Sequence, residues 1–141
     1  MFLLLLALIA MVPGQQGDAG ARDCLCETFG SDKQDFADAR RRADAIFTGR
    51  VLQIDDVVSN GWSQKRVKLK VKSHWKGRLS GDVTIFTRGG CETGFVVGEK
   101  YLVLAYVLDR ERGLYTDHCM RSGPVRLSAH YLEWLGKAKH R

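Results

Sequence analysis

Lys65-Arg66-Val67-Lys68-Leu69-Lys70-Val71-Lys72 is the most regular stretch of the chain, because apolar and basic residues alternate along it. Successive side chains of a β-strand point to opposite faces of the sheet. Val67, Leu69 and Val71 are therefore expected to face a core while the basic residues face water. This pattern predicts a half-buried antiparallel strand.

Further strands are expected on both sides of this stretch. Gly49 predicts a bulge or a sharp coil in the first of them, and Asn60-Gly61 predicts a hairpin turn within a loop over Asp55–Ser63. Runs of apolar and β-branched residues mark the other strands. The expected segments are Ala45–Ile54, Asp82–Thr87, Tyr101–Val107 and Leu114–Thr116.

A helix is expected at each end of this strand series. Apolar residues recur at helical spacing over Asp35–Phe47. Near the other end, Ser128 is expected to cap a helix that Gly136 ends; one face would carry Leu127, Tyr131, Trp134 and Leu135. The basic tail from Lys137 to Arg141 is expected to be frayed. Five short strands between two helices predict a mainly β fold, a small closed or nearly closed barrel.

The first residues predict export. Phe2–Val12 is an apolar run too short to span a bilayer, and Ala19-Gly20-Ala21 fits a signal-peptidase site. We therefore expect residues 1–21 to be a signal peptide and residues 22–141 to form one domain. The leader contains one acid and no base, so the mature chain would be more basic than the full chain, whose net charge is +6. A secreted protein without a membrane anchor is predicted, extracellular or, in a bacterium, periplasmic.

Export makes two disulfides the expected state of the four cysteines, Cys24, Cys26, Cys91 and Cys119. Cys24 and Cys26 are too close to bridge each other easily, so each is expected to reach a distant partner. Three connectivities are possible on paper. A zinc site is the alternative, and it is disfavoured because the histidines are scattered instead of paired at ligand spacing.

The basic face of the alternating strand comprises Arg66, Lys68, Lys70 and Lys72. It is interpreted either as a solvated face whose charges discourage edge pairing, or as a surface for acidic glycans. Nucleic acid is not expected as a partner, because readers of single strands place aromatic residues among their basic ones. The adjacent arginines at positions 40–42 are interpreted as a solvated helix face rather than a polyanion site.

A search for catalytic patterns indicates a binding protein. The sequence contains no convincing nucleophile elbow, zinc-protease helix, phosphate loop or glycosidase-like acid pair. The cysteines are better explained as disulfides than as nucleophiles. We therefore expect neither enzymatic activity nor a cofactor.

Several short motifs occur in an order that resembles a known family. They are Cys24-x-Cys26, Ala43-Asp44-Ala45-Ile46-Phe47-x-Gly49, Trp75-Lys76-Gly77, Val83-Thr84-Ile85-x-Thr87, Cys91, Gly98-x-x-Tyr101-Leu102-Val103 and Leu114-x-Thr116-x-x-Cys119. This set resembles the netrin-like module, most closely the N-terminal domain of tissue inhibitors of metalloproteinases. The resemblance implies a five-stranded, closed OB-type Greek-key barrel with disulfides Cys24–Cys91 and Cys26–Cys119.

The resemblance also implies a way of acting on a zinc metalloendopeptidase. In these inhibitors the first cysteine is the mature N-terminus, and its α-amino nitrogen and carbonyl oxygen chelate the protease zinc. Here that residue would be Cys24, provided that the mature chain begins there, with Leu25 entering the primary pocket. The protease-binding residues would be Cys24, Leu25, Cys26, Gly90 and Cys91, the last two in a loop that flanks the wedge.

Two alternatives stay open at this point. The chain could be a netrin-like extracellular module that binds a protein or an acidic glycan through its basic face. Cys24-Leu25-Cys26 could also be a purely structural staple, since disulfides commonly serve stability alone.

Overall fold

A computed structural model describes residues 25–59, 61–88, 93–108 and 113–139. The fold is mainly β, with helices at both ends of the strand series, as predicted. Its elements are α1 (Asp32–Arg42), β1 (Ala45–Ser59), β2 (Trp62–Lys76), β3 (Asp82–Thr87), β4 (Lys100–Val107), β5 (Leu114–Thr116), the 3-10 helix η1 (His118–Met120), β6 (Gly123–Pro124), the 3-10 helix η2 (Val125–Leu127) and α2 (Ala129–Leu135).

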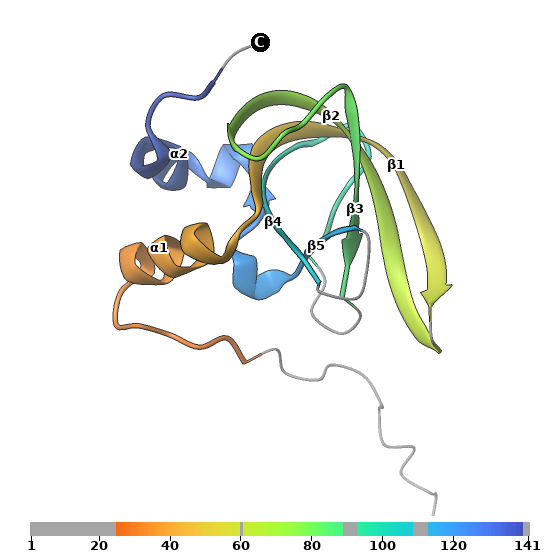
Figure 1. Cartoon of the computed structure of the whole chain (residues 1–141), viewed down its shortest axis with the longest axis horizontal. Coiled ribbons are helices and arrows are strands. Elements are labelled where there is room, and N and C mark those ends of the chain that lie inside the picture. Colours follow the sequence, from red (N-terminus) through yellow and green to blue (C-terminus); the bar gives the residue numbers. More distant parts are fainter. Residues whose placement is uncertain (1–24, 60, 89–92, 109–112, 140–141) are drawn as a thin grey trace, which may run out of the picture.

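Five of the strands form a closed ring, because β1 pairs with both β2 and β4 (Figure 1). Around the ring the order is β1-β2-β3-β5-β4, and β6 adds to β4 outside it. The β3–β5 pair is parallel and the other pairs are antiparallel. This confirms the predicted OB-type Greek-key barrel.

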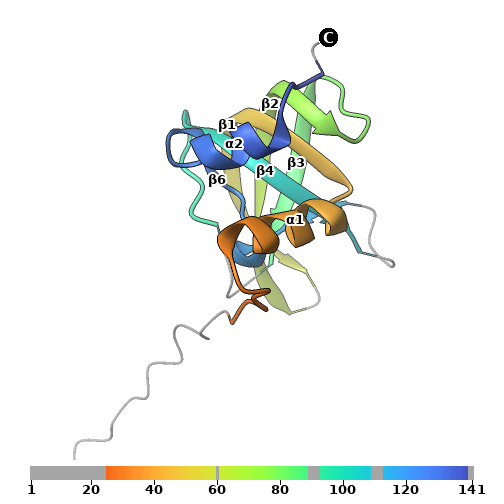
Figure 2. The same cartoon turned by 90° about the vertical axis from the view of Figure 1, so that its left-hand side faces the viewer.

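The apolar residues form two layers. One fills the barrel and includes Phe47, Leu69 and Val103, while the other lies between the barrel and the helices and includes Phe36 and Leu104. In both views α1 and α2 cover the same side of the barrel (Figures 1 and 2). β4 is buried on both faces because it separates the two layers, which explains its uninterrupted apolar run.

The helix boundaries differ from the prediction. α1 begins at Asp32, where the Ser31 side chain accepts a hydrogen bond from the backbone N–H of Gln34 (3.2 Å). It ends at Arg42, and Phe47 lies in β1, because pairing with β4 buries it inside the barrel. At α2, Ser128 donates its hydroxyl to the carbonyl of Pro124 (2.8 Å) and makes no side-chain cap.

Leu127 and the C-terminal tail also differ from the prediction. Leu127 belongs to η2 and is 63% exposed, so it does not share the buried face of α2. The tail is attached at one point, because Lys139 N–H donates to the carbonyl of His74 (2.8 Å) in an isolated bridge. Gly136 does end α2, with a positive φ of 72°.

The β1–β2 hairpin is longer than predicted. Residues 55–59 belong to β1 instead of a loop, and Asp55 and Asp56 pair with Arg66 and Lys65 across the hairpin. The register shifts between Thr48 and Gly49, which confirms the irregularity expected there. A Cβ at Gly49 would lie 3.1 Å from the Cβ of Leu69, so the close approach of β1 and β2 favours glycine at this position.

Candidate functional site

The first candidate site is the end of the barrel that carries the N-terminal segment. Residues 25–31 run beneath α1, at the end where β3 and β4 finish and where the tip of the β1–β2 hairpin also lies (Figures 1 and 2). We call this region the N-terminal end. The first residues of β3 and β4, Asp82 and Lys100, lie in one row across β2 and β1 on the other side of the barrel, and β4 extends about 20 Å from that row.

One covalent bond fixes the N-terminal segment to the barrel. Cys26 is bonded to Cys119 in η1, across 93 residues of sequence. This pairing, which the resemblance implied, is confirmed. Cys24, Gly90 and Cys91 lie outside the described residues, so the Cys24–Cys91 bond and the arrangement of those three residues stay predictions.

A carboxylate supplies a second attachment a few residues later. Asp35 Oδ1 accepts a hydrogen bond from Phe29 N–H (2.6 Å), and its Oδ2 accepts one from the Arg121 guanidinium (2.8 Å). The Asp35 side chain is 10% exposed and that of Arg121 25%. The charge pair therefore links the N-terminal segment, α1 and the residue that follows η1. Sequence analysis did not find it, because positions 35 and 121 meet only in the folded chain.

A second carboxylate holds η1, the partner of the disulfide, in place. Asp117 accepts hydrogen bonds from Cys119 N–H (2.9 Å) and from the Tyr106 hydroxyl (3.0 Å). Burial, and then the Asp117 charge, raise the pKa of Tyr106 to about 12. The phenol is therefore neutral at physiological pH and remains a donor to Asp117.

Several elements at the N-terminal end each carry an exposed apolar side chain. Leu25 is 91% exposed and directly precedes Cys26, which forms the disulfide with Cys119. Val58 and Trp62, at the tip of the β1–β2 hairpin, are 78% and 59% exposed, and Val107 at the end of β4 is 50% exposed. Exposed apolar residues rimmed by polar ones are typical of protein-binding surfaces.

The second candidate site is the predicted basic face, which lies on the outer side of β2 as expected. Its four cations differ in their surroundings. Arg66 pairs with Asp55 and Lys68 pairs with Asp82, each at 3.3 Å. Within the described residues, Lys70 and Lys72 have no carboxylate at ion-pair distance. Lys72 is also the extra residue of β2 at the register shift opposite Thr48 and Gly49, so it lies outside the regular ladder.

The strand register extends this basic face to two cations that sequence analysis missed. Arg50 of β1 lies directly opposite both Lys70 of β2 and Lys100 of β4. All three are exposed, whereas their chain neighbours Val51, Leu69 and Tyr101 are buried. We call Lys100, Arg50 and Lys70 the cationic row. Finding it from sequence requires the pairing of β1 with β4, which no local pattern reveals.

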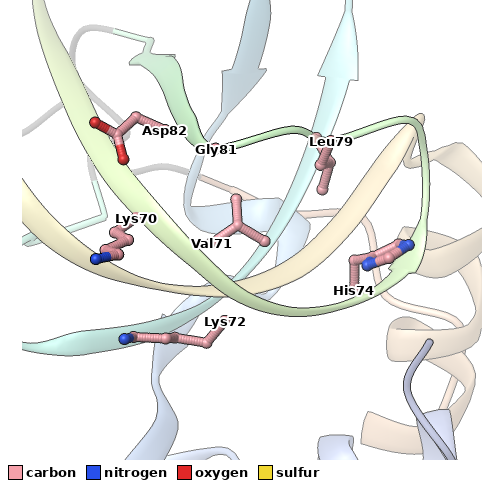
Figure 3. Close-up of a pocket in the computed structure, with 7 residues that line it drawn as sticks. All are labelled: Lys70, Val71, Lys72, His74, Leu79, Gly81 and Asp82. Carbon is pink, nitrogen blue, oxygen red and sulfur yellow. The ribbon is translucent and has the colours of Figure 1, made fainter. Parts of the chain in front are cut away.

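A shallow pocket of about 140 Å³ borders the row (Figure 3). Its apolar lining comes from Val71 and Leu79, and its polar lining from Lys70, Lys72, His74 and Asp82. Figure 3 shows the ammonium groups of Lys70 and Lys72 extending in the same direction, away from His74. The pocket is thus a recess beside exposed cations, not an enclosed anion cage.

The side chains of the arginines at positions 40–42 contact partners on α1 and α2. Arg41 and Arg42 pair with Asp38, and Arg40 donates to the carbonyl of Trp134 (3.4 Å). The two arginines beside Asp38 lower the pKa of its carboxyl, and the hydrogen bond from Arg42 is the larger cause. These contacts agree with the interpretation as a solvated helix face.

Two further features bear on the kind of site present. Within the described ranges, no three side chains of the His, Cys, Asp or Glu type gather in a way that could hold a metal ion. None of the helices in the same ranges has the length and apolar character that crossing a bilayer requires. Comparisons with models of protein families and with curated proteins find no match to this chain.

Proposed function

We propose that the chain is a secreted inhibitor of zinc metalloendopeptidases that acts through its N-terminal end. The OB-type barrel and the Cys26–Cys119 disulfide agree with the resemblance to tissue inhibitors of metalloproteinases. The inhibitor would present the segment around Leu25 to the active-site cleft of the protease. Its target class is the zinc endopeptidases with an apolar primary pocket.

One observation carries the proposal: Leu25 is 91% exposed immediately before a residue that is covalently fixed. A single exposed leucine is ordinary on a protein surface. A leucine held beside a disulfide has lost much of its freedom before binding, so a partner loses less entropy in capturing it. This combination suits a wedge that enters a pocket.

The chemistry of the wedge depends on where the mature chain begins. An α-amino group has a pKa of about 8, so it can lose its proton and coordinate zinc. An amide nitrogen cannot, because its lone pair is delocalised into the carbonyl. The inhibitory form must therefore begin at Cys24, two residues beyond the cleavage site expected after Ala21.

The decisive experiment compares three forms of the oxidised protein. One begins at Cys24, one begins at Arg22, and one carries a single alanine before Cys24. We expect the first to inhibit zinc metalloendopeptidases and the other two to be weaker by at least about 100-fold, since each 1.4 kcal/mol of binding is tenfold. Equal inhibition by all three would exclude zinc chelation, and no inhibition by any would remove the proposed function.

The role of Leu25 can be tested on the Cys24 form. Leu25→Gly should weaken inhibition and change the ranking of target proteases, because the side chain that fills the primary pocket is lost. Leu127→Gly is the matched control, since Leu127 is 63% exposed and lies on η2. Equal effects of the two substitutions would contradict a specific role for Leu25.

A further inference from the structure

We propose that the cationic row, extended by Lys72, binds a linear sulfated polysaccharide. This surface lies at the starts of β3 and β4, away from the N-terminal end. The inference does not depend on protease inhibition.

The positive charge of the row is only partly compensated: Lys70 has Asp82 opposite it on β3, and the described partner of the Arg50 side chain is the neutral carbonyl of Gly98. Like charges directly opposite each other on neighbouring strands are destabilising. Arg50 nevertheless has a cation opposite it on both sides, Lys70 and Lys100. Within the described residues, none of the three has a carboxylate at ion-pair distance. An anionic ligand would relieve this repulsion, so binding and stability are coupled at this surface.

Acidic residues limit the cationic surface on both sides. Beyond Lys70 the next strand places Asp82 opposite, and Asp82 pairs with Lys68. Beyond Lys100, Glu99 pairs with Arg126 (3.8 Å). Both flanks are thus internally neutralised. An acidic polymer is expected to cross β4, β1 and β2 and then follow β2 toward Lys72.

The spacing of the cations favours a polymer over a small anion as the ligand. The four cations are exposed and lie on three strands, with neighbouring strands about 4.8 Å apart and alternate residues of one strand about 6.7 Å apart. Such a strip offers no enclosed set of donors to a single sulfate ion. A chain with repeated sulfate groups can contact several cations at once and releases its condensed counterions in doing so.

The residues around the cations favour a glycan over nucleic acid as the ligand. Lys100, Arg50, Lys70 and Lys72 are not interleaved with aromatic residues on which bases could stack. The expected export of the chain also places it among extracellular polymers. Sulfate groups need only cations, so this surface has what a sulfated glycan requires.

The test is binding of defined heparin fragments, measured by calorimetry at several salt concentrations. The variant is Arg50→Gln/Lys70→Gln/Lys100→Gln. The control is Lys33→Gln/Arg41→Gln/Lys137→Gln, which has the same net charge and alters exposed residues on the helices and after α2. We expect the row variant to lose at least about tenfold in affinity and about three units of salt slope, and the control to lose under twofold.

Several outcomes would overturn the proposal. Equal losses in the two variants would mean that net charge alone attracts heparin. A single-stranded DNA of equal charge that binds as tightly as heparin would make the surface a general polyanion site. Saturable binding of inorganic sulfate at the same affinity as heparin would point to a small-anion site. Thermal unfolding of both variants checks the fold, and protease inhibition by the row variant keeps this result separate from the proposed function.

Discussion

The two ends of the barrel are built in opposite ways. At the N-terminal end, a disulfide and two carboxylates fix the segment that carries Leu25, and each carboxylate receives two donors. At the other end, the cationic row lies on paired strands, and the side chain of Arg50 donates a hydrogen bond to the carbonyl of Gly98. The N-terminal end therefore has a fixed shape, whereas the other end has adjacent positive charges.

The core explains why the charged end is tolerated. Each cation of the row is next to a residue that is at most 1% exposed: Arg50 next to Val51, Lys70 next to Leu69 and Lys100 next to Tyr101. Burying such a side chain stabilises the fold by about 1.5–3 kcal/mol, whereas a like-charge pair costs about 0.2–1 kcal/mol. Like charges can therefore lie side by side on an exposed face where the layer beneath them is well packed.

The largest expected effect comes from removing the disulfide with Cys26→Ser/Cys119→Ser. Stability should fall by about 2–5 kcal/mol, because the bond closes a long loop of the chain. Urea unfolding measures this loss. At urea concentrations below the unfolding midpoint of the variant, heparin affinity should be unchanged while protease inhibition is lost. A parallel loss of heparin affinity would show that the two ends are not independent.

A smaller loss is expected from Asp35→Ala. It leaves the Arg121 guanidinium and the Phe29 N–H without their acceptor in a partly buried site, which should cost about 1–3 kcal/mol. Hydrogen exchange should accelerate most at Phe29. Asp35→Asn keeps an acceptor and removes the charge, so it should lie between wild type and alanine.

Asp38→Ala is the control for this substitution. Asp38 is also on α1, but its partners Arg41 and Arg42 are exposed, so the loss should be smaller than for Asp35→Ala. An equal loss from the two substitutions would contradict the special role of the Asp35–Arg121 pair in holding the N-terminal segment.

The sequence determined the barrel better than it determined either site. The alternation over 65–72 and the apolar run over 101–107 reflect local burial, so the strands could be predicted from them. The 55–59 extension of β1 could not, because its polar residues are stabilised by ion pairs across the hairpin instead of by a core. The periodicity of apolar residues in a sequence indicates which side chains are buried, but it does not indicate ion pairs between neighbouring strands.

The same limit applies to the candidate sites. Leu25 and Cys26 were found from spacing and resemblance, and Lys70 and Lys72 from alternation. Arg50 and Lys100 were missed because each is a single cation, Arg50 within the predicted strand Ala45–Ile54 and Lys100 directly before the apolar run Tyr101–Val107. They form a row with Lys70 only because the ring closes and places β1 between β2 and β4. Long-range register is the information that a single sequence does not display.

Tyr106 gives a pH-dependent test of the N-terminal end. Its pKa in the folded chain, about 12, is above the usual value of 10.0, so the folded state binds the phenolic proton more tightly. The stability from this group is therefore complete below about pH 10 and is lost as pH rises from about 10 to about 12. The phenolate would face Asp117, while Arg88 partly offsets the repulsion.

Tyr106→Phe should remove this part of the alkaline loss. At neutral pH it should cost about 1 kcal/mol for the hydrogen bond to Asp117. Urea midpoints at pH 8, about 10 and about 11.5 compare the two proteins across the window in which the phenol titrates. Tyr131→Phe is the companion variant, because Tyr131 also has a pKa of about 12, raised by burial and then by Asp32, but joins α2 to α1. A wild-type slope that persists in Tyr106→Phe would exclude Tyr106 as its source.

The smallest expected effect is also the one with the opposite sign. Lys70→Gln removes one of the two like-charge neighbours of Arg50. Asp82, which lies opposite Lys70 on β3, keeps its ion pair with Lys68, so stability should rise by a few tenths of a kcal/mol at low ionic strength. The gain should shrink in about 1 M salt, where charges are screened within about 3 Å. Lys68→Gln, which loses its pair with Asp82, should be neutral or slightly destabilising. Lys70→Gln should weaken heparin binding while it stabilises the fold. A variant that loses both stability and affinity would mean that Lys70 has a structural partner, and the cationic row would then not be a surface kept for an external anion.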